Sequence, residues 1–96
     1  MIARLWRGRA GSAGNADAYQ RHVIGQVLPG LRAVPGHRGA QVLRRNDEFL
    51  VITLWDSMDA IRRFAGEDSE RAVVEPEARA VLAEFDDFVR HYEVQE

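Results

Sequence analysis

The three histidines are the side chains of this sequence best suited to exchange a proton near neutral pH. His91 lies in an alternating segment late in the chain and is the candidate general base or hydrogen-bond donor; the alternative is a satisfied histidine in a subunit interface. His22 follows Tyr19 on an expected helix, where both side chains can reach a ligand, although a half-exposed helix position is the alternative for His22. His37 stands in a Pro-Gly loop and is expected to be solvated. No two histidines have the His-x-His or His-x₃-His spacing of a shared metal ion, so we expect no metal site.

Aromatic and cationic side chains on expected strands form a second group of candidates. Arg4 and Trp6 share one face of the first strand, because side chains two residues apart point the same way. Burying a guanidinium without a partner is costly, so Arg4 is expected to anchor a ligand carboxylate or phenolate, to pair with an acid such as Glu93, or to lie at a dimer rim. Trp55 can stack on an aromatic ligand or pack in the core. Tyr92 and the histidine before it point to opposite faces, so one of them faces a pocket.

Composition removes several classes of chemistry. The 96 residues make one domain and contain no cysteine, which excludes disulfides, a thiol nucleophile and thiolate zinc sites. All 13 basic side chains are arginine, so no lysine can form a Schiff base. Residues 1–45 hold eight arginines against one acid, and residues 46–96 hold five against fourteen; we expect these charges to satisfy one another in a compact fold rather than to bind nucleic acid. With neither a long apolar run nor a signal-like start, the chain is expected to be cytoplasmic and without a membrane partner.

The elements that must position these residues follow from the pattern of apolar side chains. Asn15 is the expected N-cap of the first helix, and Pro29-Gly30 is its expected end. Pro76 suits the first turn of a later helix, after an acidic connector that we interpret as solvated or, alternatively, as a lid over a pocket. Strands are predicted over 2–9, 39–45, 49–55 and 88–94, and helices over 16–28, 58–65 and 76–85.

This order predicts an α+β, ferredoxin-like βαββαβ fold. Its four-stranded antiparallel sheet would carry the helices on one face. The segment Phe49–Trp55 is apolar on both faces, as in a strand that is covered on both sides. Because the helices cover only one face, a second sheet is expected to cover the other.

Several segments together resemble the antibiotic biosynthesis monooxygenase (ABM) family of the dimeric α+β barrel superfamily. The resemblance is carried by Ile52–Ser57 (ITLWDS) with the helix start that follows it, by Phe64–Asp68, by Phe88–Val94, and by the turns at Leu28–Leu31 and Pro35-Gly36. It spans residues 1–96 as a single domain. It implies a homodimer whose sheets pack face to face into a barrel, with a pocket between each sheet and its own helices. Family members include cofactor-independent oxygenases of aromatic phenols, quinol oxygenases and haem-degrading enzymes.

The sequence departs from the best understood members at three positions. Aromatic-phenol oxygenases of the family place an asparagine four residues before the tryptophan, where this chain has Val51. Haem-degrading relatives place a haem-ligating histidine where this chain has Val74, and their first-strand asparagine has no match within Ile2–Gly8. The haem-degrading function is therefore disfavoured, whereas an oxygenase keeps the fold and the tryptophan.

Two functions follow from the resemblance. The first is a cofactor-independent monooxygenase for a small aromatic or quinol-type substrate, in which a base deprotonates a phenol and the resulting anion itself reduces oxygen. The second is a non-catalytic dimeric module that binds a small ligand or only another copy of itself. An RNA-recognition domain shares the βαββαβ order, but residues 47–52 carry acids and aliphatics instead of its basic and aromatic pattern.

Overall fold

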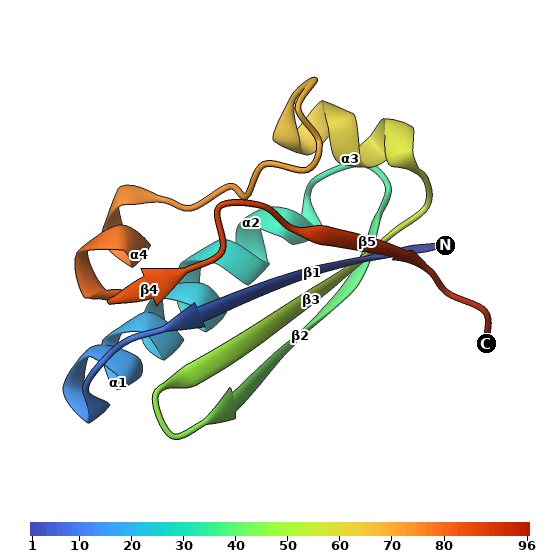
Figure 1. Cartoon of the computed structure of the whole chain (residues 1–96). Coiled ribbons are helices and arrows are strands. Elements are labelled where there is room, and N and C mark those ends of the chain that lie inside the picture. The colour runs from blue at the N-terminus through green and yellow to red at the C-terminus, as the bar shows by residue number, and fades with distance from the viewer.

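One antiparallel sheet carries all the helices on one of its faces (Figure 1), as the sequence predicts. The computed structural model describes residues 1–96. The long strands lie in the order β2-β3-β1, and the short β4 and β5 both pair with β1, one after the other along its length. The strands are β1 (Ile2–Arg9), β2 (His37–Arg45), β3 (Glu48–Trp55), β4 (Glu84–Phe85) and β5 (Arg90–Glu93).

Two short strands, β4 and β5, occupy the fourth position of the sheet, where the sequence predicts one strand over 88–94. Between β4 and β5 the chain turns from β1 to the acidic connector before α4: the Val89 N–H donates to the Glu70 carbonyl and the Ala72 N–H donates to the Asp87 carbonyl. These backbone bonds compete with the ladder to β1 and interrupt it. The connector is therefore fixed by hydrogen bonds against the segment that joins β4 to β5.

The first helical region is longer than predicted and runs past Pro29. Ser12, not Asn15, is the N-cap, because its hydroxyl accepts from the Asn15 N–H. A π-helical turn changes the register of the helical hydrogen bonds before Pro29. The proline therefore falls in the first turn of the next helical segment, where its lack of an N–H is tolerated. The elements are α1 (Ala13–His22), the π-helix η1 (Val23–Val27) and α2 (Leu28–Arg32).

Two further helices follow β3. Helix α3 (Met58–Ala65) begins after Ser57, whose hydroxyl accepts from the Ala60 N–H, and ends before Gly66, as predicted. Helix α4 (Pro76–Val81) starts at its proline but is shorter than predicted, because Leu82 turns to extended backbone and Phe85 then belongs to β4. No helix of the chain is both long and apolar enough to cross a membrane.

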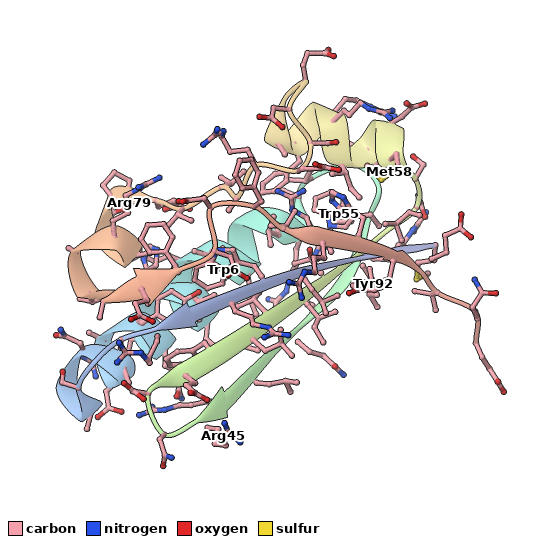
Figure 2. The ribbon with its side chains drawn as sticks, viewed as in Figure 1. Trp6, Arg45, Trp55, Met58, Arg79 and Tyr92 are labelled. Atoms are coloured by element: carbon pink, nitrogen blue, oxygen red, sulfur yellow. The ribbon has the colours of Figure 1, made fainter.

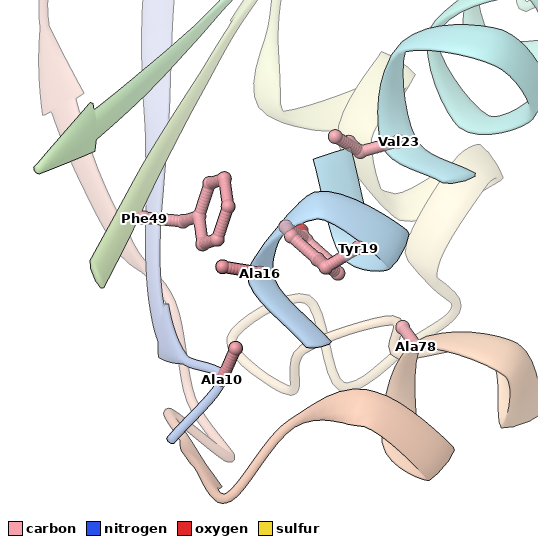
Figure 3. Packing of buried hydrophobic residues seen from close by; sticks show 6 residues of the cluster. All are labelled: Ala10, Ala16, Tyr19, Val23, Phe49 and Ala78. Carbon is pink, nitrogen blue, oxygen red and sulfur yellow. The ribbon is translucent and has the colours of Figure 1, made fainter. Parts of the chain in front are cut away.

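Apolar packing joins the helices to the sheet in two clusters. In the first, Tyr19 of α1 meets Phe49 of β3 edge to face at 4.7 Å, with small alanines around them (Figure 3). In the second, Trp55 at the end of β3 is fully buried against Leu31 of α2 and Ile61 of α3. Small side chains beside aromatic rings allow the helices to lie close to the sheet.

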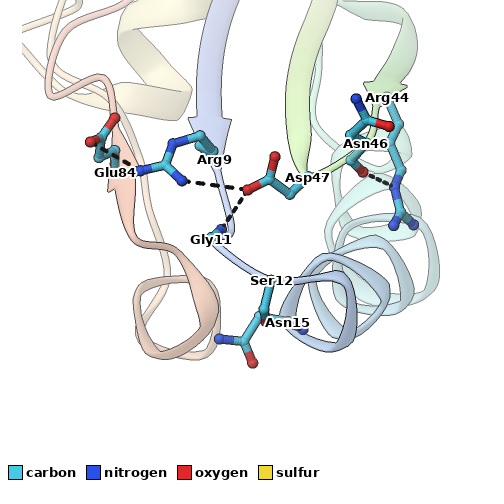
Figure 4. A network of polar contacts seen from close by, with 8 residues as sticks. All are labelled: Arg9, Gly11, Ser12, Asn15, Arg44, Asn46, Asp47 and Glu84. Atoms are coloured by element: carbon cyan, nitrogen blue, oxygen red, sulfur yellow. Dashed lines mark hydrogen bonds and ion pairs between the residues drawn. The ribbon is translucent and has the colours of Figure 1, made fainter.

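A polar network ties the far end of β1 to the β2–β3 hairpin and to β4 (Figure 4). Arg9 pairs with Asp47 at 3.4 Å and with Glu84 at 3.1 Å. The same Asp47 carboxylate accepts from the Gly11 N–H at 2.9 Å. This end of the strand therefore balances its cation with carboxylates.

The other face of the sheet has no helix over it (Figure 1). The ladder places Leu5 beside Ile52, and Leu43 beside Leu50, on this face. Leu43 is 47% exposed and the others are half-buried. The doubly apolar β3 thus has one covered face and one open face in the single chain.

Candidate functional site

A small apolar cavity lies between the sheet and the helices. Its volume is about 90 Å³, smaller than an engineered cavity of ~150 Å³ that takes up benzene, and it opens to the surface of the chain. Eleven of its fifteen lining residues are hydrophobic. The lining residues are Arg4, Trp6, Val51 and Thr53 from the sheet; Tyr19, His22, Val23, Val27, Leu31, Phe64 and Ala78 from the helices; and Val73, Val74, Glu75 and Val89 from the connecting segments.

Arg4 of β1 is the one cation of this wall, and no carboxylate pairs with it. Its residue is 5% exposed, and its guanidinium donates to the carbonyls of Ser69 at 2.6 Å and Arg71 at 3.0 Å and contacts His91 Nε2 at 2.9 Å. The expected alternative of an ion pair with Glu93 is not formed. Burial lowers the pKa of Arg4 to about 10, so the group stays charged at neutral pH. Three of its five N–H donors are used by these contacts within the chain.

His91 of β5 lies beside Arg4 in the antiparallel ladder and outside the cavity lining. Because arginine has only donors, His91 Nε2 must accept from it, and the ring proton is then on Nδ1. Burial, and then the Arg4 charge, hold the pKa of His91 below its ordinary value, against a weaker opposing effect of Glu70. The structure therefore places His91 behind the guanidinium as its support.

His22 at the end of α1 reaches the cavity from the helical wall. The residue is 8% exposed, and its Nε2 is buried without any hydrogen bond. Glu75 Oε2 is 3.8 Å away, and one ligand atom each of His22, Glu75 and Glu77 lie within 4.8 Å of one another. This is the one set of side chains spaced to hold a metal ion, and both glutamates in it are exposed. Tyr19 lies one turn earlier, and burial raises the pKa of its phenol well above the ordinary value.

The two tryptophans have different surroundings (Figure 2). Trp6 lines the cavity, with its indole N–H donating to the Asp86 carbonyl at 3.0 Å. Trp55 is fully buried outside the lining; its N–H donates to Thr53 Oγ1 at 2.9 Å, and its ring stacks on Phe64 at 5.2 Å. Of its two expected positions, stacked on a ligand or packed in the core, Trp55 takes the core position, and Phe64 stands between it and the cavity.

The structure thus gathers Arg4, Trp6, Tyr19 and His22 at one cavity and leaves three other candidates outside it. Trp55 lies in the core, His91 lies behind Arg4, and Tyr92 is 51% exposed on the opposite strand face. Sequence reasoning missed Phe64 and Thr53 as lining residues. Of the two alternatives stated for the acidic connector, a solvated stretch or a lid over a pocket, the second agrees better with the structure, because Val73, Val74 and Glu75 line the cavity.

Comparison with known proteins identifies the class to which this arrangement belongs. The sequence profile of the antibiotic biosynthesis monooxygenase family matches residues 9–76, so the chain belongs to that family. No match is found among curated protein sequences.

Solved structures share the fold at low sequence identity. SnoaB, a cofactor-independent oxygenase from Streptomyces nogalater, has a TM-score of 0.72 at 16% identity over 99% of this chain and 93% of that one. The ActVA-Orf6 monooxygenase of Streptomyces coelicolor, bound to nanaomycin D, has a TM-score of 0.59 at 20% identity over 70% and 62% of the chains. A MhuD variant that holds two manganese protoporphyrin IX molecules per active site has a TM-score of 0.70 at 18% identity over 100% and 96%. At these identities the likeness shows the fold alone.

Proposed function

We propose that this chain is a cofactor-independent, monooxygenase-like protein that acts on a small aromatic or quinol-type substrate in the cavity between sheet and helices. The observation that carries the proposal is the buried Arg4 guanidinium, which makes no ion pair and borders a mostly apolar cavity. A buried charge without a counter-ion is costly to the fold, and an anion bound beside it would offset part of that cost.

The chemistry requires an anion in a dry place. When an electron-rich phenol or quinol loses a proton, the electron pair stays on the ring and oxygen, and this anion can transfer electrons to O₂ directly. Oxygen then bonds to a ring carbon that carries hydrogen, and the peroxide takes up the proton that the substrate lost. Water leaves with that carbon's hydrogen and the outer oxygen of the hydroperoxide, and a carbonyl remains. Arg4 stabilises the anion before and during electron transfer, and the apolar wall of Trp6, Val51 and Phe64 excludes water from it.

Oxygen uptake by the metal-free protein with small hydroquinones and anthrone-type phenols tests this proposal. Arg4→Met should abolish the uptake, whereas Arg21→Met, at an exposed position of α1 outside the cavity lining, should leave it unchanged. Circular dichroism and thermal unfolding establish that both variants fold. Protein-dependent uptake that survives in a folded Arg4→Met protein would contradict the assigned role of the guanidinium.

One observation favours the second candidate function, a ligand-binding module without turnover. Val51 lines the cavity at the position where aromatic-phenol oxygenases of the family are expected to carry an asparagine, so this wall has one polar group fewer. Binding of a phenol that depends on Arg4, without any oxygen uptake across the panel, would establish this alternative.

We also propose that two copies pack through the open face of the sheet. The half-exposed side chains Leu5, Leu50, Ile52 and Leu54 form an apolar surface without a helix over it. Burying such a surface contributes about 25 cal/mol per Å². Light scattering should give a dimer for the wild type, and Ile52→Asp should convert it to a monomer; a wild-type monomer at micromolar concentration contradicts the proposal.

A further inference from the structure

The buried His22 imidazole at the end of α1 has a ring nitrogen that no group of the chain satisfies. Its Nε2 makes no hydrogen bond, although the residue is only 8% exposed. Glu75 Oε2 lies 3.8 Å from this nitrogen, which is beyond hydrogen-bond distance. Buried polar atoms without a partner are uncommon in folded proteins, and each asks for an explanation. An ion held between the nitrogen and the carboxylate supplies one.

Two carboxylates meet this nitrogen at the start of α4. One ligand atom each of His22, Glu75 and Glu77 lie within 4.8 Å of one another. Glu75 directly precedes α4 and Glu77 stands in its first turn. The one ion pair that either glutamate enters is the long contact between Glu75 and His22. An imidazole and two carboxylates without an arginine partner therefore face one another, in a chain that has 13 arginines.

The distances and the burial of this set suit a metal ion. Bonds from Zn²⁺ to imidazole nitrogen and carboxylate oxygen are about 2.0–2.2 Å long, so two such ligands at a tetrahedral angle lie about 3.4 Å apart. The 3.8 Å between His22 Nε2 and Glu75 Oε2 is slightly longer than this. Both glutamates are exposed, so their side chains can rotate toward an ion, whereas burial holds the imidazole in place.

We propose that His22, Glu75 and Glu77 bind a divalent first-row transition-metal ion, with Zn²⁺ as the representative. The ligands are His22 Nε2 and one carboxylate oxygen of each glutamate. This mixed nitrogen and oxygen set favours such an ion over Mg²⁺ or Ca²⁺, which prefer oxygen ligands alone. Three protein ligands leave the fourth position of a tetrahedral ion for water, or for an oxygen of a ligand in the cavity that His22 and Glu75 line.

This site goes beyond the proposed function. A bound divalent ion neutralises the two carboxylates beside the cavity, so the helical wall would repel an anionic ligand less. The sequence argument against a metal site concerned pairs of histidines. This set instead joins one histidine to two glutamates far along the chain, which come together because α4 packs against α1. Oxygen uptake is measured without metal, so its outcome is independent of this site.

Isothermal titration calorimetry of the metal-free full chain with zinc chloride tests the proposal. Wild type should bind one ion. Glu77→Gln should weaken the binding at least about tenfold, the loss that even an outer partner of a metal ligand causes. Glu67→Gln is the matched control, because Glu67 is an exposed acid of the same connector outside the set. No one-site binding by wild type at millimolar Zn²⁺, or equal affinities in the two variants, would overturn the proposal.

Nitrogen-15 NMR of the wild-type imidazoles tests the buried ligand without a substitution in the core. Zn²⁺ should shift the Nε2 signal of His22 in step with the occupancy that calorimetry gives. The Nε2 signal of His37 should stay in place, because that atom is also buried without a partner but belongs to no such set. A His22 signal that does not move while Zn²⁺ binds would assign the ion to surface acids and overturn the proposal. Binding of Mg²⁺ as tight as that of Zn²⁺ would overturn the assigned class of ion.

Discussion

Two arginines of β1 lie in opposite electrostatic surroundings. Arg9, at the hairpin end of the strand, is partly exposed and pairs with Asp47 and Glu84. Arg4, five residues earlier, is almost fully buried and meets two backbone carbonyls and a histidine, with no carboxylate. Partly exposed ion pairs contribute little to stability, whereas an unpaired buried cation costs the fold and creates a site for an anion. The hairpin end of the strand is therefore structural in character, and the cavity end has the character of a binding site.

The largest expected effect separates these two arginines directly. Arg4→Met should weaken binding of the 4-nitrophenolate anion by about 100-fold or more, because it removes a desolvated charge that contacts the ligand. Arg9→Met should leave the affinity unchanged. Absorbance titrations of both folded variants make the measurement. Equal losses in the two variants would show that affinity follows the net charge of the strand rather than the cavity cation.

A second comparison uses two acids, one from each region. Glu75→Gln removes a carboxylate from the cavity lining and should strengthen binding of the 4-nitrophenolate anion by about threefold, because a like charge beside the ligand is lost. Glu84→Gln removes a partner of Arg9 and should leave the affinity unchanged. Absorbance titrations at a pH where the free phenol is ionised give both results. If Glu75→Gln behaves like Glu84→Gln, the Glu75 charge does not act on the bound anion.

Lowering the pH should weaken the contacts at the cavity end of β1 before those at its hairpin end. The pKa of His91 is lowered in the folded protein from its ordinary 6.5, so the stability it contributes is complete above that pH and is lost as the pH falls through the lower, folded value. Protonated His91 cannot accept from Arg4, so the hold on the guanidinium is lost too. Urea unfolding between pH 7.5 and about pH 5 should show stability decreasing with acid, and less steeply in His91→Gln. Part of the slope should remain, because the pKa of His37 is also lowered by burial and by Arg32. An unchanged slope in His91→Gln contradicts this assignment.

Short-range patterns in the sequence were enough to predict the fold and four of the fifteen residues that line the cavity. Period-two alternation in β1 put Arg4 and Trp6 on one face, and helical spacing put Tyr19 beside His22. The family match and the shared fold confirm the resemblance that the ITLWDS segment carries. These features depend on residues close together in sequence.

What could not be predicted depends on contacts between distant segments. The partners of Arg4 are backbone carbonyls of Ser69 and Arg71, which every sequence possesses and no pattern marks. The sequence left open whether Trp55 stacks on a ligand or packs in the core. Residues of α2 and α3 pack against its ring and place it in the core. The first helical region continues past Pro29 because the π-helix Val23–Val27 changes its hydrogen-bond register. No residue type next to the proline marks that change in the sequence.

The smallest expected effect completes the comparison at the hairpin end. Arg9→Met should lower the urea midpoint only slightly, because the ion pairs it breaks are partly exposed and compete with water. The difference from wild type should shrink further at high salt, since mobile ions screen exposed charges. Asp47 should keep its bond from the Gly11 N–H, which needs no cation. Unfolding curves at low and high salt test this. A large, salt-independent loss of stability would mean that the hairpin network stabilises β1 as strongly as the core does. The two arginines would then differ in function and not in their contribution to the stability of the fold.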